Sequence, residues 1–227
     1  MSASARTGVV VAIDGPSGSG KSSTSRGVAA RLGLRYLDTG AMYRAMTWWM
    51  LRHDVPVDDP AAVAARCGDP VIGSGTDPAA PTITVDGADV AAAIRTPEVT
   101  GAVSAVSAVP QVRARLLDLQ REAIAGALDE GGIVVEGRDI GSVVVPDADV
   151  KIYLPADAAA RAARRAAEEG GSDVAATESS LLARDQIDST RTTSPLTMAE
   201  GAVHVDTTPY TLEEVVDLIV GLVEDSR

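Results

Sequence analysis

Short apolar runs alternate with stretches of helical spacing along most of the chain. Residues 8–13 read GVVVAI, a β-branched run typical of a parallel strand that is covered on both faces. Further runs that favour strands lie at 34–37, 132–135, 150–154 and 202–205. Patterns that favour helices lie at 21–32, 41–52, 110–128, 156–169, 179–190 and 211–224. This alternation predicts an α/β fold with a parallel sheet between helices.

The middle of the chain departs from this alternation. Residues 69–90 are rich in Pro, Gly, Asp and Thr, and Val85-Asp86-Gly87-Ala88 fits a hairpin turn between two small strands. Thr96 then fits a helix N-cap, with Pro97 at the first helical position. We therefore expect a small insert here, followed by helices, rather than another strand of the main sheet.

Composition narrows the choices further. Hydrophobic residues make up 45% of the 227 positions and Phe is absent, so the core must consist mainly of Val, Leu, Ile and Ala. A single cysteine, Cys67, excludes an internal disulfide, and the separation of His53 from His204 argues against a histidine metal site. The N-terminus MSASARTG lacks an apolar signal region, and no apolar run is long enough to span a membrane. We expect a soluble, cytoplasmic protein.

The charge balance limits the partners. The formal net charge is −12, which argues against nucleic acid or an anionic membrane as a partner. A phosphate site must therefore be a local concentration of positive charge within an acidic protein. Only Lys21 and Lys151 are lysines, so the position of each one is informative.

Lys21 lies in a phosphate-binding motif. Residues 15–22 read GPSGSGKS and satisfy G-x-x-x-x-G-K-[ST] between a predicted strand and a predicted helix. Glycines let successive N–H groups turn inward around an anion, Lys21 would reach the β- and γ-phosphates, and the Ser22 hydroxyl would bind Mg²⁺. The predicted ATP-binding residues are Gly15, Pro16, Ser17, Gly18, Ser19, Gly20, Lys21, Ser22 and Ser23.

Three classes of P-loop protein are compatible with this motif alone. A GTPase needs an [NT]-K-x-D segment, which neither lysine supplies, and a motor or transport ATPase needs paired acids and a signature segment that are missing. A small-molecule kinase needs a second phosphate site and a cationic lid. Arg161, Arg164 and Arg165 share one helix face by spacing, and so do Arg184 and Arg191. These arginines favour a lid of two helices on either side of Gly170-Gly171, with solvated helix faces as the alternative.

Beyond the P-loop, several segments together resemble bacterial cytidylate kinase over nearly the whole chain. The matching segments are IDGPSGSGKSS (13–23), LDTGAMYRA (37–45), VAAAIRTPEV (90–99), PQVR (110–113), EGRDIGSVVVPDADVKIYL (136–154), RAARR (161–165) and RDQIDSTRTTSPL (184–196). Glu136 stands where the family usually has Asp, and Thr39 where it usually has Ser; both substitutions keep the chemical type.

The resemblance implies a three-layer P-loop kinase core with a five-stranded parallel sheet. It implies that residues 1–65 and 114–227 form this core, with a helical lid at about 160–192, and that residues 66–113 form a small α/β insert for the nucleoside monophosphate. The implied reaction is ATP + CMP or dCMP giving ADP + CDP or dCDP by direct in-line transfer with Mg²⁺. We expect a monomer.

The resemblance also implies roles for individual residues. Catalysis would depend on Lys21, Arg138, Arg191 and Arg164, the last closing over ATP. The residues implied to bind the acceptor are Thr39, Tyr43, Arg44, Ser104, Arg113, Glu136, Arg138, Asp139, Arg184, Asp188 and Arg191. Among them Ser104, Arg113 and Asp139 would read cytosine, and Arg184 and Asp188 would contact the ribose.

Some alternatives stay open. The acceptor could be another small molecule, such as UMP or shikimate, and the protein could be a nucleotide-dependent switch with no acceptor. Asp139 could serve only to orient Arg138 through a salt bridge. Arg138 and Asp139 follow a predicted buried strand, at the sheet edge where α/β proteins bind ligands, so their position favours a site independently of the family.

Overall fold

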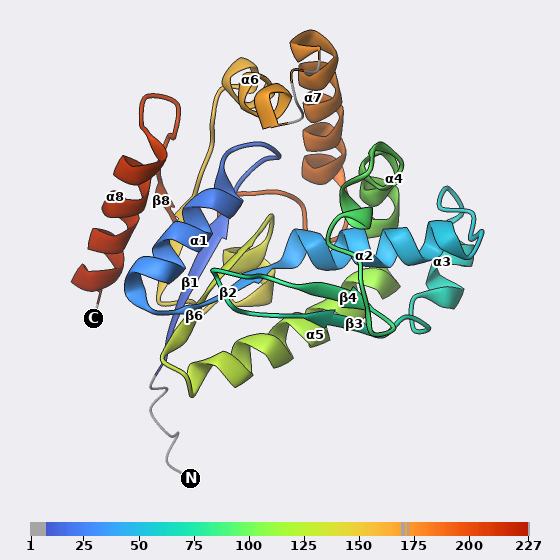
Figure 1. Ribbon diagram of the computed structural model, residues 1–227, viewed down its shortest axis with the longest axis horizontal. Helices are drawn as coiled ribbons and strands as arrows, with labels where there is room; N and C mark the ends of the chain where they lie inside the picture. The colour runs from blue at the N-terminus through green and yellow to red at the C-terminus, as the bar shows by residue number, and fades with distance from the viewer. Residues whose placement is uncertain (1–7, 169–170, 172, 227) are drawn as a thin grey trace.

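The main sheet has five strands and lies in the middle of the molecule (Figure 1). The computed structural model describes residues 8–168, 171 and 173–226. The strands are β1 (Val9–Asp14), β2 (Arg35–Asp38), β6 (Gly132–Gly137), β7 (Val150–Tyr153) and β8 (Val203–His204). All pair in parallel in the order β2-β6-β1-β7-β8, which confirms the predicted α/β fold class.

Helices cover both faces of this sheet and make it the middle of three layers. On one face, Val11, Ile13 and Val134 pack against α1 (Lys21–Leu32) and α8 (Leu212–Asp225). On the other face, Val10 and Val135 pack against α2 (Thr39–Arg52) and α5 (Pro110–Leu128). Alternate residues of one strand thus serve two separate cores, which is why the strands read as continuous apolar runs.

A second, antiparallel sheet of β3 (Ile72–Ser74), β4 (Ile83–Val85) and β5 (Ala88–Asp89) forms the predicted β insert. The hairpin turn lies at Asp86 and Gly87, with φ of 52° and 82°, as a two-residue turn of this type requires. This insert also reaches the core, because Tyr36 N on edge strand β2 donates to Thr76 O at 2.9 Å.

Along the chain, one helix precedes the small sheet, and a short turn and two helices follow it. The apolar patterns did not predict α3 (Pro60–Arg66), although Asp59 caps it by accepting hydrogen bonds from the amides of Ala61 and Ala62. A short turn, η1 (Ala93–Arg95), precedes α4 (Pro97–Ser107), whose N-cap is Thr96 as predicted. The bounds of α5 agree with those predicted from the sequence.

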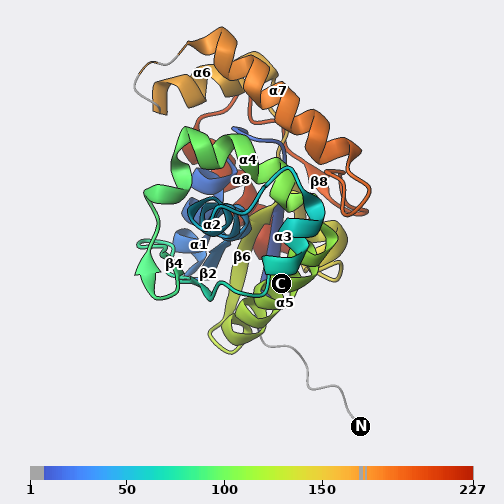
Figure 2. The same cartoon turned by 90° about the vertical axis from the view of Figure 1, so that its right-hand side faces the viewer.

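The two predicted lid helices, α6 (Ala158–Glu168) and α7 (Val174–Thr190), lie together at one end of the molecule (Figures 1 and 2). Helix α7 begins five residues before the predicted Ser179, because the Asp173 carboxylate caps it by accepting hydrogen bonds from the amides of Ala175 and Ala176. Glu169 and Gly170, where α6 was expected to end, lie outside the described residues. Within the described part of the chain, no helix is long and apolar enough to cross a membrane.

Candidate active site

The loop between β1 and α1 has the backbone that an anion-binding loop requires. Gly18 and Gly20 adopt φ of 76° and 86°, values that favour glycine. A side chain at Gly15 would place its Cβ 2.3 Å from Leu154 O, so the loop depends on close approach of two backbones. Helix α1 begins at Lys21, and its N-terminal partial charge adds to that of the loop.

Lys21 is buried inside this loop, with 6% of its surface exposed. Its Nζ donates to Pro16 O at 2.6 Å and to Ser19 Oγ at 3.4 Å. Burial, reinforced by the positive charge of Arg138, lowers the pKa of Lys21 to about 7. A bound anion would reverse this effect, because it would supply the negative charge that stabilises the protonated amine.

Both lid helices contact the loop at Ser17. Arg161 of α6 donates from Nη1 to Ser17 O at 2.8 Å and to Asp185 Oδ2 at 2.6 Å. Asp185 of α7 in turn accepts a hydrogen bond from Ser17 N at 3.2 Å. The solvated-face alternative is therefore wrong for Arg161, whose side chain is only 6% exposed.

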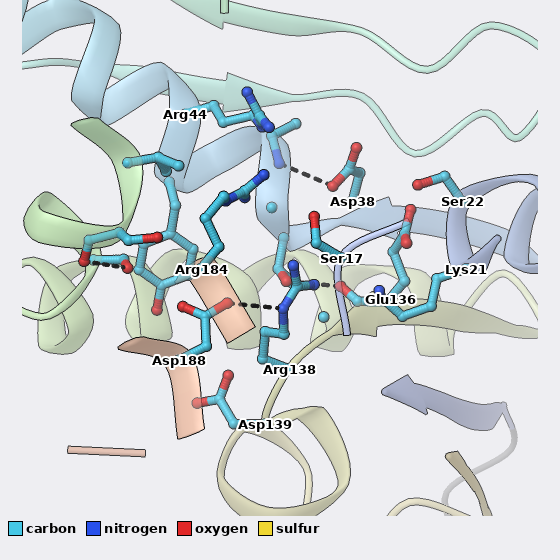
Figure 3. A pocket seen from close by; sticks show the side chains of 18 of the residues that line it. Ser17, Lys21, Ser22, Asp38, Arg44, Glu136, Arg138, Asp139, Arg184 and Asp188 are labelled. Atoms are coloured by element: carbon cyan, nitrogen blue, oxygen red, sulfur yellow. Dashed lines mark hydrogen bonds and ion pairs between the residues drawn. The ribbon is translucent and has the colours of Figure 1, made fainter. Parts of the chain in front are cut away.

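A cavity lies between this loop, the ends of β2 and β6, and helices α2, α4 and α7 (Figure 3). All eleven residues expected to bind the acceptor lie around it. Four loop residues, Ser17, Gly18, Lys21 and Ser22, lie on its wall. In the close view, Lys21 and Ser22 lie on one side, Arg184 and Asp188 lie on the opposite side, and Arg138 lies between them, below Arg44.

Some predicted residues do not line the cavity. The remaining loop positions expected to bind ATP lie outside its lining: Gly15, Pro16, Ser19, Gly20 and Ser23. Arg164 is also outside it; its guanidinium donates to Thr207 Oγ1 at 3.2 Å and Thr207 O at 2.9 Å. Because Thr207 donates to Ser19 O at 3.3 Å, Arg164 is connected to the loop from the other side.

Arginines crowd around the cavity and affect one another. Burial, and next the charge of Arg184, lowers the pKa of Arg44 to about 9. Burial, and next the positive charge of Arg138, also lowers the pKa of Arg184. The Nε of Arg184 is buried and has no hydrogen-bond partner in the part of the chain that the structure describes. Such a cluster favours binding of an anion, which would satisfy the donors and offset their mutual repulsion.

Acids hold some of these arginines in place. Arg138 Nε lies 3.1 Å from Asp188 Oδ2, and Arg191 Nη1 lies 3.5 Å from Asp188 Oδ1. Among the ion pairs of the described residues, Arg138 pairs with Asp188, whereas Asp139 pairs with Arg113. Thr39 Oγ1 donates its proton to Glu136 O at 2.7 Å. The Thr39 hydroxyl can therefore accept a hydrogen bond from a ligand but has no proton left to donate to one.

A second group lies at the α4 and α5 side of the cavity. Arg113 Nη2 lies 2.5 Å from Asp139 Oδ2, and the Arg113 guanidinium lies over the ring of Tyr43, 5.2 Å from its centre. Ser104 is 5% exposed and also lines the cavity. A donor, an acceptor, a hydroxyl and an aromatic face are thus gathered in one place, a combination suited to a polar heterocycle.

Glu136 and Ser22 supply oxygen atoms beside the phosphate loop. Burial, and next the charge of Asp38, raises the pKa of Glu136 to about 7; hydrogen bonds from Tyr36 and Ser22 oppose that rise. Hydroxyl and carboxylate oxygens are the ligands that Mg²⁺ prefers, so this donor set fits the metal. No group of three or more His, Cys, Asp or Glu residues that could hold a metal by itself occurs in the described part of the chain.

Sequence reasoning missed several residues of the site. Asp38 and Arg95 line the cavity, and Tyr36 hydrogen-bonds to Glu136. Arg165, expected only as a lid arginine, lines the cavity as well. Asp38 is the last residue of β2, and Arg138 directly follows β6, so the place of Asp38 at the carboxyl end of a strand was a usable signal. For Tyr36, which reads as an ordinary core residue, the sequence contains no comparable signal.

Comparisons with known proteins agree with the resemblance. The family model described as cytidylate kinase matches residues 11–225. A cytidylate kinase of Streptomyces avermitilis is 62% identical over 219 residues, covering 96% of this chain and 94% of its own. One of Mycobacterium leprae is 49% identical over 222 residues, covering 96% of each chain. A solved structure of an uncharacterized protein from Eubacterium ventriosum is similar in fold alone, with a TM-score of 0.51, 11% identity and coverage of 96% and 99%.

Proposed function

The chain belongs to the cytidylate kinase family, and from that premise we propose that it uses ATP to phosphorylate CMP and dCMP, giving CDP and dCDP. One observation supports this most directly: a single cavity is lined both by the phosphate loop and by a cluster of arginines on other elements. A donor and an acceptor phosphate need two such cationic regions that face each other. A switch protein without an acceptor needs only the first.

The electrostatics support an anionic acceptor. The protein has a formal net charge of −12, yet Arg44, Arg138, Arg184 and Arg191 lie around one cavity. Lowered pKa values of Arg44 and Arg184 mean that each guanidinium is held against an unfavourable environment. Keeping that arrangement costs stability, and a bound phosphate would recover it as binding energy.

The proposed mechanism is direct in-line transfer. Binding would align an oxygen of the acceptor phosphate with the γ-phosphorus of ATP, so that no covalent enzyme intermediate is needed. Lys21, Arg138 and Arg191 would neutralise charge that develops during transfer, and Arg164 would close over ATP. Mg²⁺, held by ATP and the Ser22 hydroxyl, would offset phosphate charge when bound.

The base would lie beside Arg113, Asp139, Ser104 and Tyr43. Cytosine presents an amino donor at N4 and acceptors at N3 and O2, so a carboxylate and a guanidinium on one wall complement it. Uracil has an N–H donor at N3 and a carbonyl acceptor at C4, the reverse of cytosine, and this mismatch would leave a buried polar group unpaired. This arrangement therefore supports CMP and dCMP over UMP.

Domain motion is part of the proposal. Residues 66–113 would form the acceptor-binding insert, residues 1–65 and 114–227 the core, and residues 160–192 the lid. Closure would exclude water, which would otherwise accept the phosphoryl group. The hydrogen bonds of Arg161 and Asp185 to Ser17 support a lid whose position is coupled to that of the phosphate loop.

ADP release measured by a coupled assay tests the function. With ATP and Mg²⁺, CMP and dCMP should give rapid turnover, whereas UMP, shikimate and a reaction without acceptor should give far less. Removal of Mg²⁺ with a chelator should abolish turnover. Equal ADP release with and without CMP would contradict the proposal and favour a switch or regulatory ATPase; faster turnover with UMP or shikimate would identify another acceptor.

Oligomeric state and location are separate proposals. We expect a monomer in the cytoplasm, as the sequence suggests. Light scattering coupled to size-exclusion chromatography tests the first, and cell fractionation with an antibody to the native protein tests the second.

A further inference from the structure

Asp14 is a buried acid to which the proposed chemistry assigns no role. It is the last residue of β1, lies immediately before the phosphate loop, and is 3% exposed. A charged carboxylate at such a position is expensive to bury unless it accepts hydrogen bonds. The contacts of Asp14 are therefore informative.

Both oxygens of Asp14 accept hydrogen bonds from the same backbone turn. Ile140 N lies 2.8 Å from Oδ1, and Gly141 N lies 2.8 Å from Oδ2. These amides begin the short helical turn η2 (Ile140–Val144), which follows β6. One side chain thus ties the residue before the phosphate loop to the segment that leaves the neighbouring strand.

That segment includes two residues on the cavity wall. Arg138 and Asp139 lie between the end of β6 and the two amides that Asp14 holds. The Asp139 carbonyl accepts from Val143 N at 2.9 Å, so the turn also closes on itself. Because Asp139 has φ of −145° and ψ of 26°, it belongs to no regular helix or strand, and its position depends on these contacts.

We propose that Asp14 is a positioning residue that holds Arg138 and Asp139 in register with the phosphate loop. The proposal rests on the proposed function, because the arginine is assigned there to the acceptor phosphate and the carboxylate to the base. Asp14 itself touches neither substrate in this role. It acts through two backbone hydrogen bonds, and small changes in the placement of reacting groups have large effects on rate.

The chemistry of the side chain fits the role. The two N–H donors face two different oxygens, which a carboxylate supplies, whereas an amide would place an NH₂ donor against one of them. Burial raises the pKa of Asp14 to about 6, and the bonds from Gly141 and Ile140 oppose the rise. The nearby charge of Asp139 acts in the same direction as burial, and that of Lys21 in the opposite direction.

Asp14→Asn is the appropriate test because it keeps size and removes one acceptor. Its matched control is Asp149→Asn, since Asp149 Oδ2 accepts a hydrogen bond from Val10 N at 2.7 Å near the other end of β1. We expect kcat/KM for CMP to fall about 10- to 100-fold in Asp14→Asn, mostly because kcat falls. The ratio of kcat/KM for CMP to kcat/KM for UMP should also become smaller, whereas KM for ATP should change little. Asp149→Asn should keep wild-type kinetics.

Hydrogen exchange gives a readout that needs no substrate. Amide exchange of Ile140 or Gly141, followed by NMR, should be about 10-fold or more faster in Asp14→Asn than in the wild type and in Asp149→Asn. Asp14→Ser, which keeps one small acceptor, is the second variant, and exchange of these amides should also be faster in it than in the wild type. Wild-type turnover of CMP in the same assay tests the proposed function by itself.

Two results would overturn the inference. The first is a folded Asp14→Asn enzyme that keeps the wild-type kcat and the wild-type ratio of kcat/KM for CMP to that for UMP. That result would show that the placement of Arg138 and Asp139 relative to the phosphate loop does not depend on Asp14. Unchanged exchange at both amides in Asp14→Asn and Asp14→Ser would show that the carboxylate does not hold the turn, whatever the kinetics.

Discussion

Arg113 and Asp139 form a buried ion pair, with Nη2 2.5 Å from Oδ2 and side chains 6% and 7% exposed. The two residues were expected to contact a base separately, and the structure joins them before any ligand binds. A pre-formed pair fixes the direction of the remaining donors of Arg113 and the remaining lone pairs of Asp139. Such pre-organisation lowers the cost of ordering these groups when a ligand binds.

Asp139→Asn tests whether this pair reads the base. The amide keeps the shape but places a donor where an acceptor is needed, so kcat/KM for CMP should fall more than that for UMP. One polar contact of this kind discriminates by about 1–3 kcal/mol, or about 5- to 150-fold. Steady-state kinetics with both acceptors measure the ratio, and equal losses for CMP and UMP would limit Asp139 to a structural role.

Lys21→Met should reduce turnover by several orders of magnitude and leave the fold intact. The lysine lies inside the phosphate loop, where its charge would be used most in the transition state. Lys151→Met is the matched control, because this other lysine of the chain donates to Glu200 O at 3.2 Å and does not belong to the cavity lining. Near-normal turnover of folded Lys21→Met protein would contradict the assignment of the phosphate loop.

ATP binding should also change the protonation of Lys21. Because its pKa is lowered to about 7 in the free protein, the amine is largely neutral at pH 8. Bound phosphate would raise this pKa, so binding at pH 8 should be accompanied by proton uptake, which should diminish as the pH falls below 7. Calorimetry in buffers of different ionisation enthalpy measures the uptake with a non-hydrolysable ATP analogue. Proton release, or equal uptake by Lys21→Met, would refute this prediction.

Arg184→Ala and Arg191→Ala should each weaken use of CMP far more than use of ATP. Both side chains line the cavity, and the buried Nε of Arg184 has no hydrogen-bond partner among the described residues. Loss of an arginine–phosphate contact should cost about 1.5–3 kcal/mol, or about 10- to 150-fold in kcat/KM for CMP. Arg31→Ala, which breaks an exposed ion pair with Asp217, should have no effect. Unchanged kinetics in both cavity variants would contradict the assignment of these two arginines to the acceptor.

Arg161→Met should raise KM for ATP about 10-fold, with KM for CMP nearly unchanged. Its guanidinium holds Ser17 O at 2.8 Å, so the shape of the phosphate loop depends on it. Arg26→Met is the control, since Arg26 Nε also donates to a backbone carbonyl, Pro78 O, at 2.9 Å, but near the insert. If Arg161→Met changed KM for CMP alone, the contact with Ser17 would not matter for ATP.

Local signals explain what could be predicted from the sequence. Strands β1 and β6 read as continuous apolar runs rich in β-branched residues because both of their faces are buried. The phosphate loop, the Asp86-Gly87 turn and the Thr96 cap depend on backbone angles and hydrogen bonds within a few residues, so a short window contains all the information that they need. Helix α3 was missed because its seven residues are too short for a clear periodic pattern.

The candidate site was predictable as a set of residues, and the resemblance to a family supplied most of that set. The sequence by itself determined the phosphate loop, the parallel sheet and the presence of arginines on two late helices. Only the tertiary structure decided which partners those charges take: Arg113 with Asp139, Arg138 with Asp188, and Arg161 with Ser17. Up to 144 positions separate such partners along the chain, as for Arg161 and Ser17. Strand order and helix packing bring them together, and because charge and hydrogen bonding act through space, no local pattern encodes that choice.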